Sequence, residues 1–200
     1  MAREYKMVKR LEKVEETRRR IAKATYELHS TIGPALTTIA LISNRAGLPR
    51  QTVYRNFGTQ VELFRSCIAF GQEMHPMPDP SPWKSISDPG ERLQVGLTQL
   101  YRWFEASEPV LTNGARDFGV VQEAAEVAQQ PMEDVLKRIY ETLCHGWARL
   151  EVSPVVSLAV DFATWKKLRR RQGMTSRAIV EMWSDLIRCR QPDRGRPLGK

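Results

Sequence analysis

The 200-residue sequence lacks most features of membrane, secreted and metal-binding proteins. No stretch approaches about 18 consecutive apolar residues, which argues against a transmembrane helix. Residues 1–20 are charged throughout, without the apolar segment of a secretory signal. The three cysteines, Cys67, Cys144 and Cys189, are far apart and form no Cys-x-x-Cys pair. We therefore expect no disulfide scaffold, no zinc site and no membrane partner, and a reducing, cytoplasmic location.

Motifs of catalysis and cofactor binding are also missing. The sequence has no Gly-rich phosphate loop and no Gly-x-Ser-x-Gly elbow. Cys144-His145 has the chemistry of a nucleophile or metal ligand, but His29 and His75 lie in other predicted elements and no acidic pair stands at ligand spacing. Core packing is the simpler role for Cys144. We expect neither an enzyme nor a bound cofactor or metal.

Charge is plentiful but unevenly distributed. The formal charge is +8, with 13 basic and 6 acidic residues in 1–70. Residues 71–150 hold 7 basic and 12 acidic residues, and residues 151–200 hold 11 and 5. A basic N-terminal part favours contact with a polyanion, although uneven charge on helix surfaces also arises by chance. Charge alone leaves both interpretations open.

The pattern of apolar residues predicts an all-α protein. Strand-like alternation is absent, and spacing typical of helices recurs along the chain. Residues 17–32 form one predicted helix, with Ile21, Thr25, Leu28 and Ile32 on one face, and Gly33-Pro34 ends it. Residues 1–16 are either a helical extension or a disordered arm.

Residues 37–57 predict a helix-turn-helix. Thr37 or Thr38 can cap a short helix with inward Ile39, Ile42 and Ala46, and Gly47 supplies the left-handed turn residue after it. A second short helix follows, with Pro49 in its first turn and Leu48, Val53 and Phe57 facing the core. Thr59-x-x-Glu62 is a capping box that opens a further helix with inward Leu63, Phe64, Cys67 and Ile68.

The stretch from Thr37 to Phe57 resembles the DNA-binding signature of tetracycline-repressor-type (TetR-family) regulators. The resemblance continues through Glu62-Leu63-Phe64 and back over residues 18–32, about 50 residues in all. It departs at Pro49, where the family usually has Ser, and at Gln60, where it commonly has a phosphate-contacting Lys. It implies an N-terminal helix-turn-helix three-helix domain and a C-terminal helical domain for ligand binding and dimerisation.

The outward face of the second short helix carries side chains suited to DNA. Arg matches guanine, Gln matches adenine, and hydroxyls match phosphate oxygens. Together with the resemblance, this predicts contacts to double-stranded DNA by Thr38, Arg45, Pro49, Arg50, Gln51, Thr52, Tyr54, Arg55, Asn56, Thr59 and Gln60. The N-terminal charges, among them Lys13 and Arg18, belong either to a DNA-contacting arm or to a solvated helix.

The remainder of the chain reads as one helical domain. After a proline-rich loop over 75–83, helices are predicted at 89–106, 118–151 with a break near Gln130-Pro131, 154–171 and 175–190. The basic run of residues 166–171 is best explained as a solvated helix end. The predicted division is an extension (1–16), a DNA-binding domain (17–70), an effector and dimerisation domain (71–190) and a disordered tail (191–200).

By the resemblance, the last two predicted helices form a four-helix interface in a homodimer. Their apolar stripes are compatible with this, or with a monomer core: Val155, Leu158, Phe162 and Trp165 on one, and Ile179, Met182, Trp183 and Leu186 on the other. Five aromatic residues have two possible roles, in an effector pocket or in the core: Trp103, Phe104, Phe118, Tyr140 and Trp147. The acidic surplus of residues 71–150 favours a cationic or neutral effector.

The function that these observations favour is a repressor that binds a palindromic operator as a homodimer and is released by a small-molecule effector. A ligand-independent DNA-binding or architectural protein of the same fold is the alternative. An all-helical enzyme with a fortuitous helix-turn-helix is the third, and it conflicts with the length of the TetR-like signature.

Overall fold

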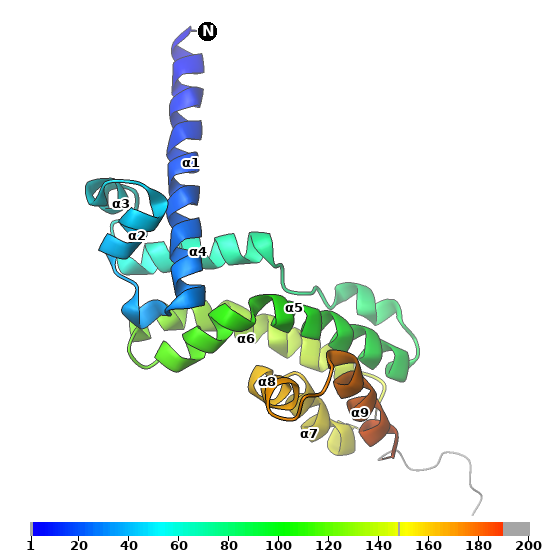
Figure 1. Cartoon of the computed structure of the whole chain (residues 1–200). Coiled ribbons are helices and arrows are strands. Elements are labelled where there is room, and N and C mark those ends of the chain that lie inside the picture. Colours follow the sequence, from blue (N-terminus) through cyan, green and yellow to red (C-terminus); the bar gives the residue numbers. More distant parts are fainter. Residues whose placement is uncertain (1, 148, 190–200) are drawn as a thin grey trace, which may run out of the picture. The chain divides into compact units, whose positions relative to one another are not determined.

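The computed structural model describes residues 2–147 and 149–189, and within them it is all-α, as the periodicity predicts (Figure 1). No helix in these ranges is long and apolar enough to span a membrane. The predicted disordered tail, 191–200, lies outside the described residues. The helices are α1 (Ala2–Thr31), η1 (Pro34–Leu36), α2 (Ile39–Ala46), α3 (Arg50–Asn56), α4 (Gln60–Met74), η2 (Ser81–Ser85), α5 (Pro89–Asp117), α6 (Gln122–Cys144), α7 (Arg149–Ala159), α8 (Phe162–Arg170) and α9 (Ser176–Cys189).

The chain divides into two compact units, and neither is a continuous stretch of sequence. The N-terminal unit combines Met1–Pro76 with Ser107–Met132, and the second unit combines Met77–Ala106 with Glu133–Lys200. The sequence places a single boundary near residue 70. The structure assigns the C-terminal end of α5 to the N-terminal unit, because that end bonds to the turn after α1.

The core of the N-terminal unit is built from all four of its first α-helices. Its buried members include Ile21 and Leu28 of α1, Ile42 of α2, Val53 of α3 and Leu63 of α4. These are positions that the helical periodicity predicts to face inward. Burial of such side chains, each worth about 1.5–3 kcal/mol, holds the short helices α2 and α3, which are too short to be stable alone.

The turn between α2 and α3 depends on Gly47, as the sequence predicts. Gly47 adopts φ 63° and ψ 39°, a left-handed conformation that glycine reaches without steric cost. Its N–H donates to the Asn44 carbonyl (3.2 Å), and the Leu48 N–H donates to the Ser43 carbonyl (3.0 Å). The Ser43 hydroxyl donates to the Leu48 carbonyl (2.6 Å), which ties the end of α2 to the start of the next segment.

Helix α1 begins at Ala2, so residues 2–16 continue the helix that the sequence predicts from residue 17. The helical alternative for this extension is therefore correct. Alternating charges at helical spacing support it, since straight-chain Lys, Arg and Glu are good helix formers. Figure 1 shows this half of α1 extending beyond α2, α3 and α4.

The end of α5 binds the C-terminal end of α1 and the turn after it. The Asn113 amide donates to the carbonyls of His29 (3.0 Å) and Ser30 (2.9 Å). The Arg116 guanidinium donates to the Ile32 carbonyl (2.8 Å), and the Asp117 carboxylate accepts from the Ala35 N–H (3.0 Å). Carbonyls that a helix end leaves without partners are thus satisfied by a distant segment.

Gly33 makes this close approach of α5 possible. It has φ 92°, and a Cβ there would overlap the side chains of Arg116 and Asp117. The Arg116 and Asp117 side chains also pair with each other (2.6 Å). The sequence explains Gly33 only as a helix stop, and its second role depends on a contact across about 80 residues.

Several predicted helix boundaries beyond residue 85 are wrong. α5 runs to Asp117 through Pro109, rather than ending at 106. α6 passes through Pro131 without the expected break and ends at Cys144, and α7 starts at Arg149 with Pro154 inside it. A proline removes one helical hydrogen bond, but packing compensates here, since Val152, Val155 and Val156 of α7 are buried.

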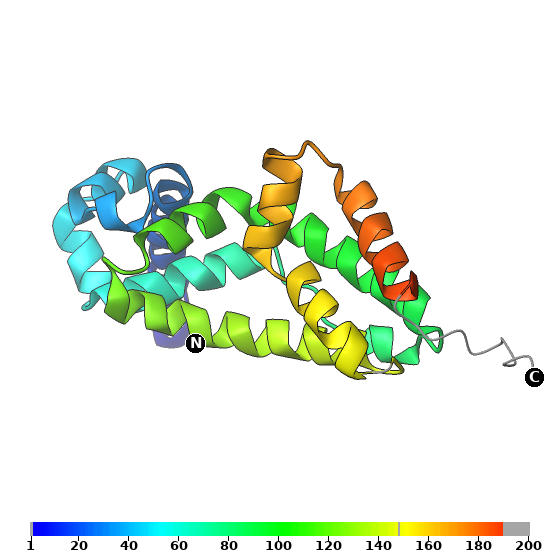
Figure 2. The ribbon, with the colours of Figure 1, turned by 90° about the horizontal axis from the view of Figure 1, so that it is seen from below.

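The predicted helix 154–171 is in fact divided between α7 and α8 (Figure 2). Asp161 begins the new helix, because its carboxylate accepts from the Thr164 N–H (2.6 Å). Asp is one of the preferred N-cap residues, so the sequence did contain the signal. The proline-rich loop ends in the short η2, whose Trp83 is 2% exposed.

Candidate nucleic-acid interface

Helix α3 has one anchored face and one open face. Val53 is fully buried and Phe57, just after the helix, is 4% exposed. On the other side Arg50, Gln51 and Arg55 are exposed, and Tyr54 exposes 60% of its surface. A helix that reads base edges must be fixed by its scaffold while it presents donors outward, and α3 meets both conditions.

Two predicted contact residues, Thr52 and Asn56, are only half-exposed. The Asn56 amide donates to the Thr52 carbonyl of the same helix (2.8 Å). The Asn56 carbonyl accepts from the guanidinium of Arg18, which also lies 4.3 Å from the centroid of the Phe57 ring. The structure therefore gives Arg18 a role that the sequence does not indicate: it fixes the C-terminal end of α3.

Pro49 precedes the first residue of α3 and makes no side-chain cap. Its φ of −59° and ψ of 144° suit an N-cap residue, and its carbonyl accepts from the Thr52 N–H (2.9 Å). The helix start is therefore intact without the serine that the family usually has. Because proline has no hydroxyl that could cap the helix, the first N–H groups of α3 are left to bind solvent or a ligand.

Two other helices begin beside α3, and each is capped by a threonine. The Thr38 hydroxyl accepts from the Leu41 N–H of α2 (3.3 Å), and the Thr59 hydroxyl accepts from the Glu62 N–H of α4 (3.1 Å). The Glu62 carboxylate in turn accepts from the Gly58 N–H (2.9 Å). In a standard capping box it would accept from the N–H of the cap residue itself, which here is Thr59. Helix N-termini carry partial positive charge, which favours phosphate nearby.

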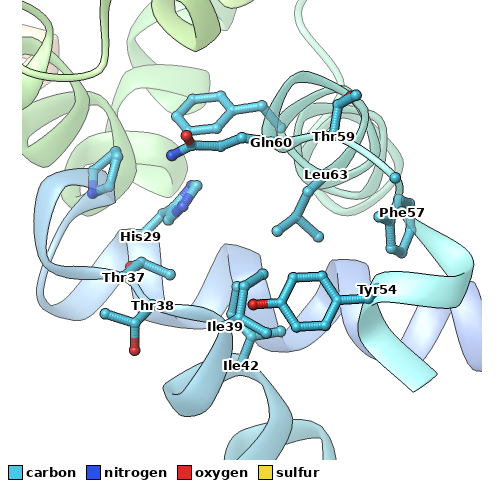
Figure 3. Close-up of a pocket in the computed structure, with 13 residues that line it drawn as sticks. His29, Thr37, Thr38, Ile39, Ile42, Tyr54, Phe57, Thr59, Gln60 and Leu63 are labelled. Carbon is cyan, nitrogen blue, oxygen red and sulfur yellow. The ribbon is translucent and has the colours of Figure 1, made fainter. Parts of the chain in front are cut away.

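A pocket of about 320 Å³ lies among these elements (Figure 3). The Tyr54 ring extends across it toward Ile39 and Ile42, and Thr38 and Thr59 stand at different sides of its rim. Gln60, the first residue of α4, also lines it and is exposed. The structure thus brings together four predicted contact residues: Tyr54 of α3, Gln60 of α4, and Thr38 and Thr59, which precede α2 and α4.

His29 forms the buried wall of this pocket. Its ring is 4.8 Å from the Phe64 ring centroid, and its Nδ1 is 3.4 Å from the Cys67 sulfur. Burial disfavours the charged imidazolium and lowers the pKa of His29 from 6.5 to about 4, although the nearby Asp117 carboxylate opposes the shift. Burial raises the pKa of the Cys67 thiol to about 12. At neutral pH both groups are therefore uncharged core residues.

Arginines of α1 and α2 hold the outer side of the helix-turn-helix. Arg45, a predicted DNA contact, is exposed and pairs with the Glu27 carboxylate of α1 (3.3 Å). Arg20 donates to the Ala46 carbonyl at the end of α2 (2.8 Å). Sequence reasoning misses Arg20 because the contact joins residues 26 positions apart.

The predicted effector residues do not all lie in one unit. Phe118 belongs to the N-terminal unit, whereas Trp103, Phe104, Tyr140 and Trp147 belong to the second. Phe104 is fully buried among aromatic rings, with its centroid 5.3 Å from Phe162 and 5.4 Å from Trp165. The Tyr140 hydroxyl bonds to the Ser153 hydroxyl. The indole N–H of Trp147 is buried and has no acceptor among the described residues.

Cys144 is buried, as its predicted core role requires. Across residues 2–147 and 149–189 we find no group of three or more His, Cys, Asp or Glu side chains arranged to hold a metal ion.

The part of the sequence that matches a known protein family contains the helices of this interface. Residues 21–67, from the middle of α1 into α4, match the family model of bacterial regulatory proteins, tetR family. Residues 21–67 therefore form a DNA-binding domain of the TetR family. Its helix-turn-helix is therefore that of a DNA-binding transcriptional regulator, and regulators of this family bind DNA and typically dimerise.

Solved structures extend the likeness beyond residues 21–67 to the second unit, at the level of the fold. A "putative fatty acid metabolism regulator" of Clostridium perfringens is 14% identical, with a TM-score of 0.60 over 84% of this chain and 97% of its own. A transcriptional regulator of Aquifex aeolicus VF5, described as TerR/AcrR family, is 18% identical, with a TM-score of 0.56 over 86% and 98%. No curated protein matches the sequence.

Proposed function

We propose that this TetR-family chain is a cytoplasmic repressor that binds a palindromic operator as a homodimer and releases it when a small molecule binds the second unit. The observation that supports this most strongly is the open face of α3, where Arg50, Gln51 and Tyr54 point outward from a helix whose other face is buried. Arg50 and Gln51 read base edges, and Tyr54 contacts phosphate.

Around α3, helix starts and hydroxyls provide phosphate anchors. Thr38 and Thr59 hold the N-termini of α2 and α4, and Gln60 stands beside Thr59 at the position of the usual lysine. Gln60 donates a neutral hydrogen bond and adds no charge. We therefore expect a smaller salt dependence of DNA binding than a lysine would give, by about one unit in the log–log slope.

The homodimer would form through the last helices of the second unit. Val155, Trp165, Ile179 and Trp183 of the predicted stripes are buried within the chain and cannot contact a partner directly. Leu158 and Leu186, in contrast, are 52% and 41% exposed. Exposed leucines on α7 and α9 supply the apolar centre that a stable interface between two copies needs.

The effector would bind in the second unit near Trp147. A buried indole N–H without an acceptor costs free energy, and a ligand oxygen would satisfy it. The ring of Trp147 is also near the start of α5, since a Cβ on Gly90 would lie 4.0 Å from it. Helices α5 and α6 each continue from this unit into the N-terminal one, so a ligand that prefers one arrangement of them can change DNA binding.

The test of DNA binding is a selection from random double-stranded DNA with the full chain. We expect enrichment of an inverted repeat with half-sites about one helical turn apart, and a complex that weakens as salt rises. Enrichment of a single half-site would contradict the homodimer, and no enrichment would contradict sequence-specific binding.

The effector needs a separate test. A thermal-shift screen of metabolites, followed by titration of the protein–DNA complex, should find a compound that raises Tm and releases the DNA. Its effect should disappear in Trp147→Phe, which keeps an aromatic, although smaller, side chain and removes the N–H. A screen in which stabilising compounds leave DNA binding unchanged would favour the ligand-independent regulator.

A further inference from the structure

The half of α1 that extends beyond α2, α3 and α4 (Figure 1) carries apolar side chains that are exposed to solvent. Met7, Val8, Leu11 and Val14 expose 62, 47, 64 and 45% of their surfaces. Met7, Leu11 and Val14 are separated by four and three residues, which places them along one line of the helix. This alternation of fours and threes is the seam of a coiled coil, and Val8 widens it on one side.

Charges of opposite sign border the two sides of this seam. Arg10 and Lys13 lie along one edge, and Glu12 and Glu15 lie along the other, because each residue turns the helix by about 100°. All four side chains are exposed. The segment therefore has an apolar seam, a basic edge and an acidic edge.

This arrangement decides which partner fits. When two such helices pack seam to seam in the same direction, the basic edge of each meets the acidic edge of the other. When they pack in opposite directions, like edges meet and repel. We propose that residues 7–15 of α1 bind the same segment of a second copy of the chain as a parallel coiled coil, with Leu11 facing Leu11 and Arg10 facing Glu15 of the other copy.

DNA fits the segment less well than a second copy does. Arg10 and Lys13 could contact phosphates, but the apolar seam would stay in water and Glu12 and Glu15 would approach the polyanion. A second copy covers the seam and neutralises both edges at once. The sequence leaves two roles for the N-terminal charges, a DNA-contacting arm or a solvated helix. Self-association is a third role, and it also accounts for the exposed apolar residues.

The pairing is short and therefore weak by itself. Three seam positions bury little surface, and isolated helices below about 12–15 residues are marginal in water. In free chains the pair is short-lived, and it becomes more populated where two chains are held close together, for example on neighbouring DNA sites, because proximity raises the effective concentration. Disulfide cross-linking is the appropriate measurement, because it captures a weak pair covalently.

The experiment uses the full chain with Cys189→Ser, since Cys67 and Cys144 are buried and Cys189 is exposed. Leu11→Cys places thiols on the seam, and the matched control Glu16→Cys places them on the opposite side of α1. Oxidised glutathione then converts two thiols to one disulfide and releases reduced glutathione, and non-reducing gels give the rate of dimer formation. We expect the seam position to cross-link at least about tenfold faster, since facing seam residues reach disulfide distance.

Charge reversal tests the direction of the pairing. In the Leu11→Cys chain, Arg10→Glu and Glu15→Arg should each slow cross-linking about tenfold, and the two together should restore it. Equal rates at positions 11 and 16 would overturn the proposal, as would a double reversal that fails to restore the rate. An arm that contacts DNA would instead show weaker DNA binding for Arg10→Glu, stronger binding for Glu15→Arg and no preferential cross-link.

Discussion

At the scale of single residues, polar side chains of the N-terminal unit hold its helices in place. Arg18 and Arg20 bind the ends of α3 and α2, and Asn113 binds the end of α1. Buried His29 fills the space between α1 and α4 as a neutral ring. The side chains of Arg50, Gln51 and Tyr54 are thereby left exposed, and we propose that they contact DNA.

His29 makes the stability of the unit sensitive to acid. Its pKa is about 4 in the folded chain and 6.5 when unfolded, so the unfolded state binds the proton first as pH falls. The stabilisation is complete above pH 6.5 and decreases between pH 6.5 and 4, by about 3 kcal/mol in total. Urea unfolding at pH 7 and pH 4.5 should show a much smaller decrease for His29→Phe than for the wild type.

The matched control for His29 is His145→Gln, whose side chain is exposed. It should keep the wild-type dependence on pH. If His29→Phe keeps it too, other groups cause the acid sensitivity, such as Asp117, whose pKa is lowered by its bond to Arg116.

Arg18 should matter for stability although it lies outside the reading face. Arg18→Ala removes a charged hydrogen bond to Asn56 and a cation–π contact with Phe57, and should cost about 1–3 kcal/mol. The neighbouring Arg19 is exposed, pairs with Glu73 and lies 5.4 Å from the Phe70 ring centroid, so Arg19→Ala should cost less than Arg18→Ala because solvent screens its interactions. Urea unfolding of the two variants measures the difference, and equal costs would contradict the role of Arg18.

At the scale of elements, short-range signals explain the helix-turn-helix well. Thr38, Gly47 and Thr59 act within four residues of their own positions, so the sequence predicts α2, the turn and the start of α4 correctly. The break predicted near Pro131 and the helix start predicted at 154 are both wrong, because α6 runs through Pro131 and buried valines hold α7 despite Pro154. The contacts of Arg18, Arg20 and Asn113 join residues 26 to 84 positions apart, which no local pattern encodes.

Gly47 provides a test of the turn. Gly47→Ala forces a side chain into the left-handed region and should lower the free energy of unfolding by about 1 kcal/mol. Gly114 is the matched control: it lies inside α5, and a Cβ there meets no atom within 4 Å. Gly114→Ala should raise stability by about 0.5–1 kcal/mol. Thermal unfolding of both variants should therefore give shifts of opposite sign.

At the scale of the whole molecule, the basic N-terminal part of the chain is also the part that matches a known protein family. The first 70 residues carry 13 basic and 6 acidic side chains, and they contain the whole match to the TetR family model. Residues 107–132 complete this unit, so the DNA-binding part includes chain that the sequence assigns to the effector domain. The exposed face of α3 could be predicted from sequence because exposure follows helical spacing, whereas the packing of the aromatic residues in the second unit could not.

The central claim is that the outward face of α3 reads DNA sequence, and selection from random DNA with the wild type and Gln51→Ala tests it most directly. We expect the wild type to enrich one inverted repeat, and Gln51→Ala to lose its preference at a single position in each half-site at a cost of about 1–3 kcal/mol. Tyr54→Phe should instead weaken binding to all sequences alike while it keeps the preferred site. If Gln51→Ala and Arg50→Ala both select the wild-type site with unchanged preference at every position, α3 is not the reading helix.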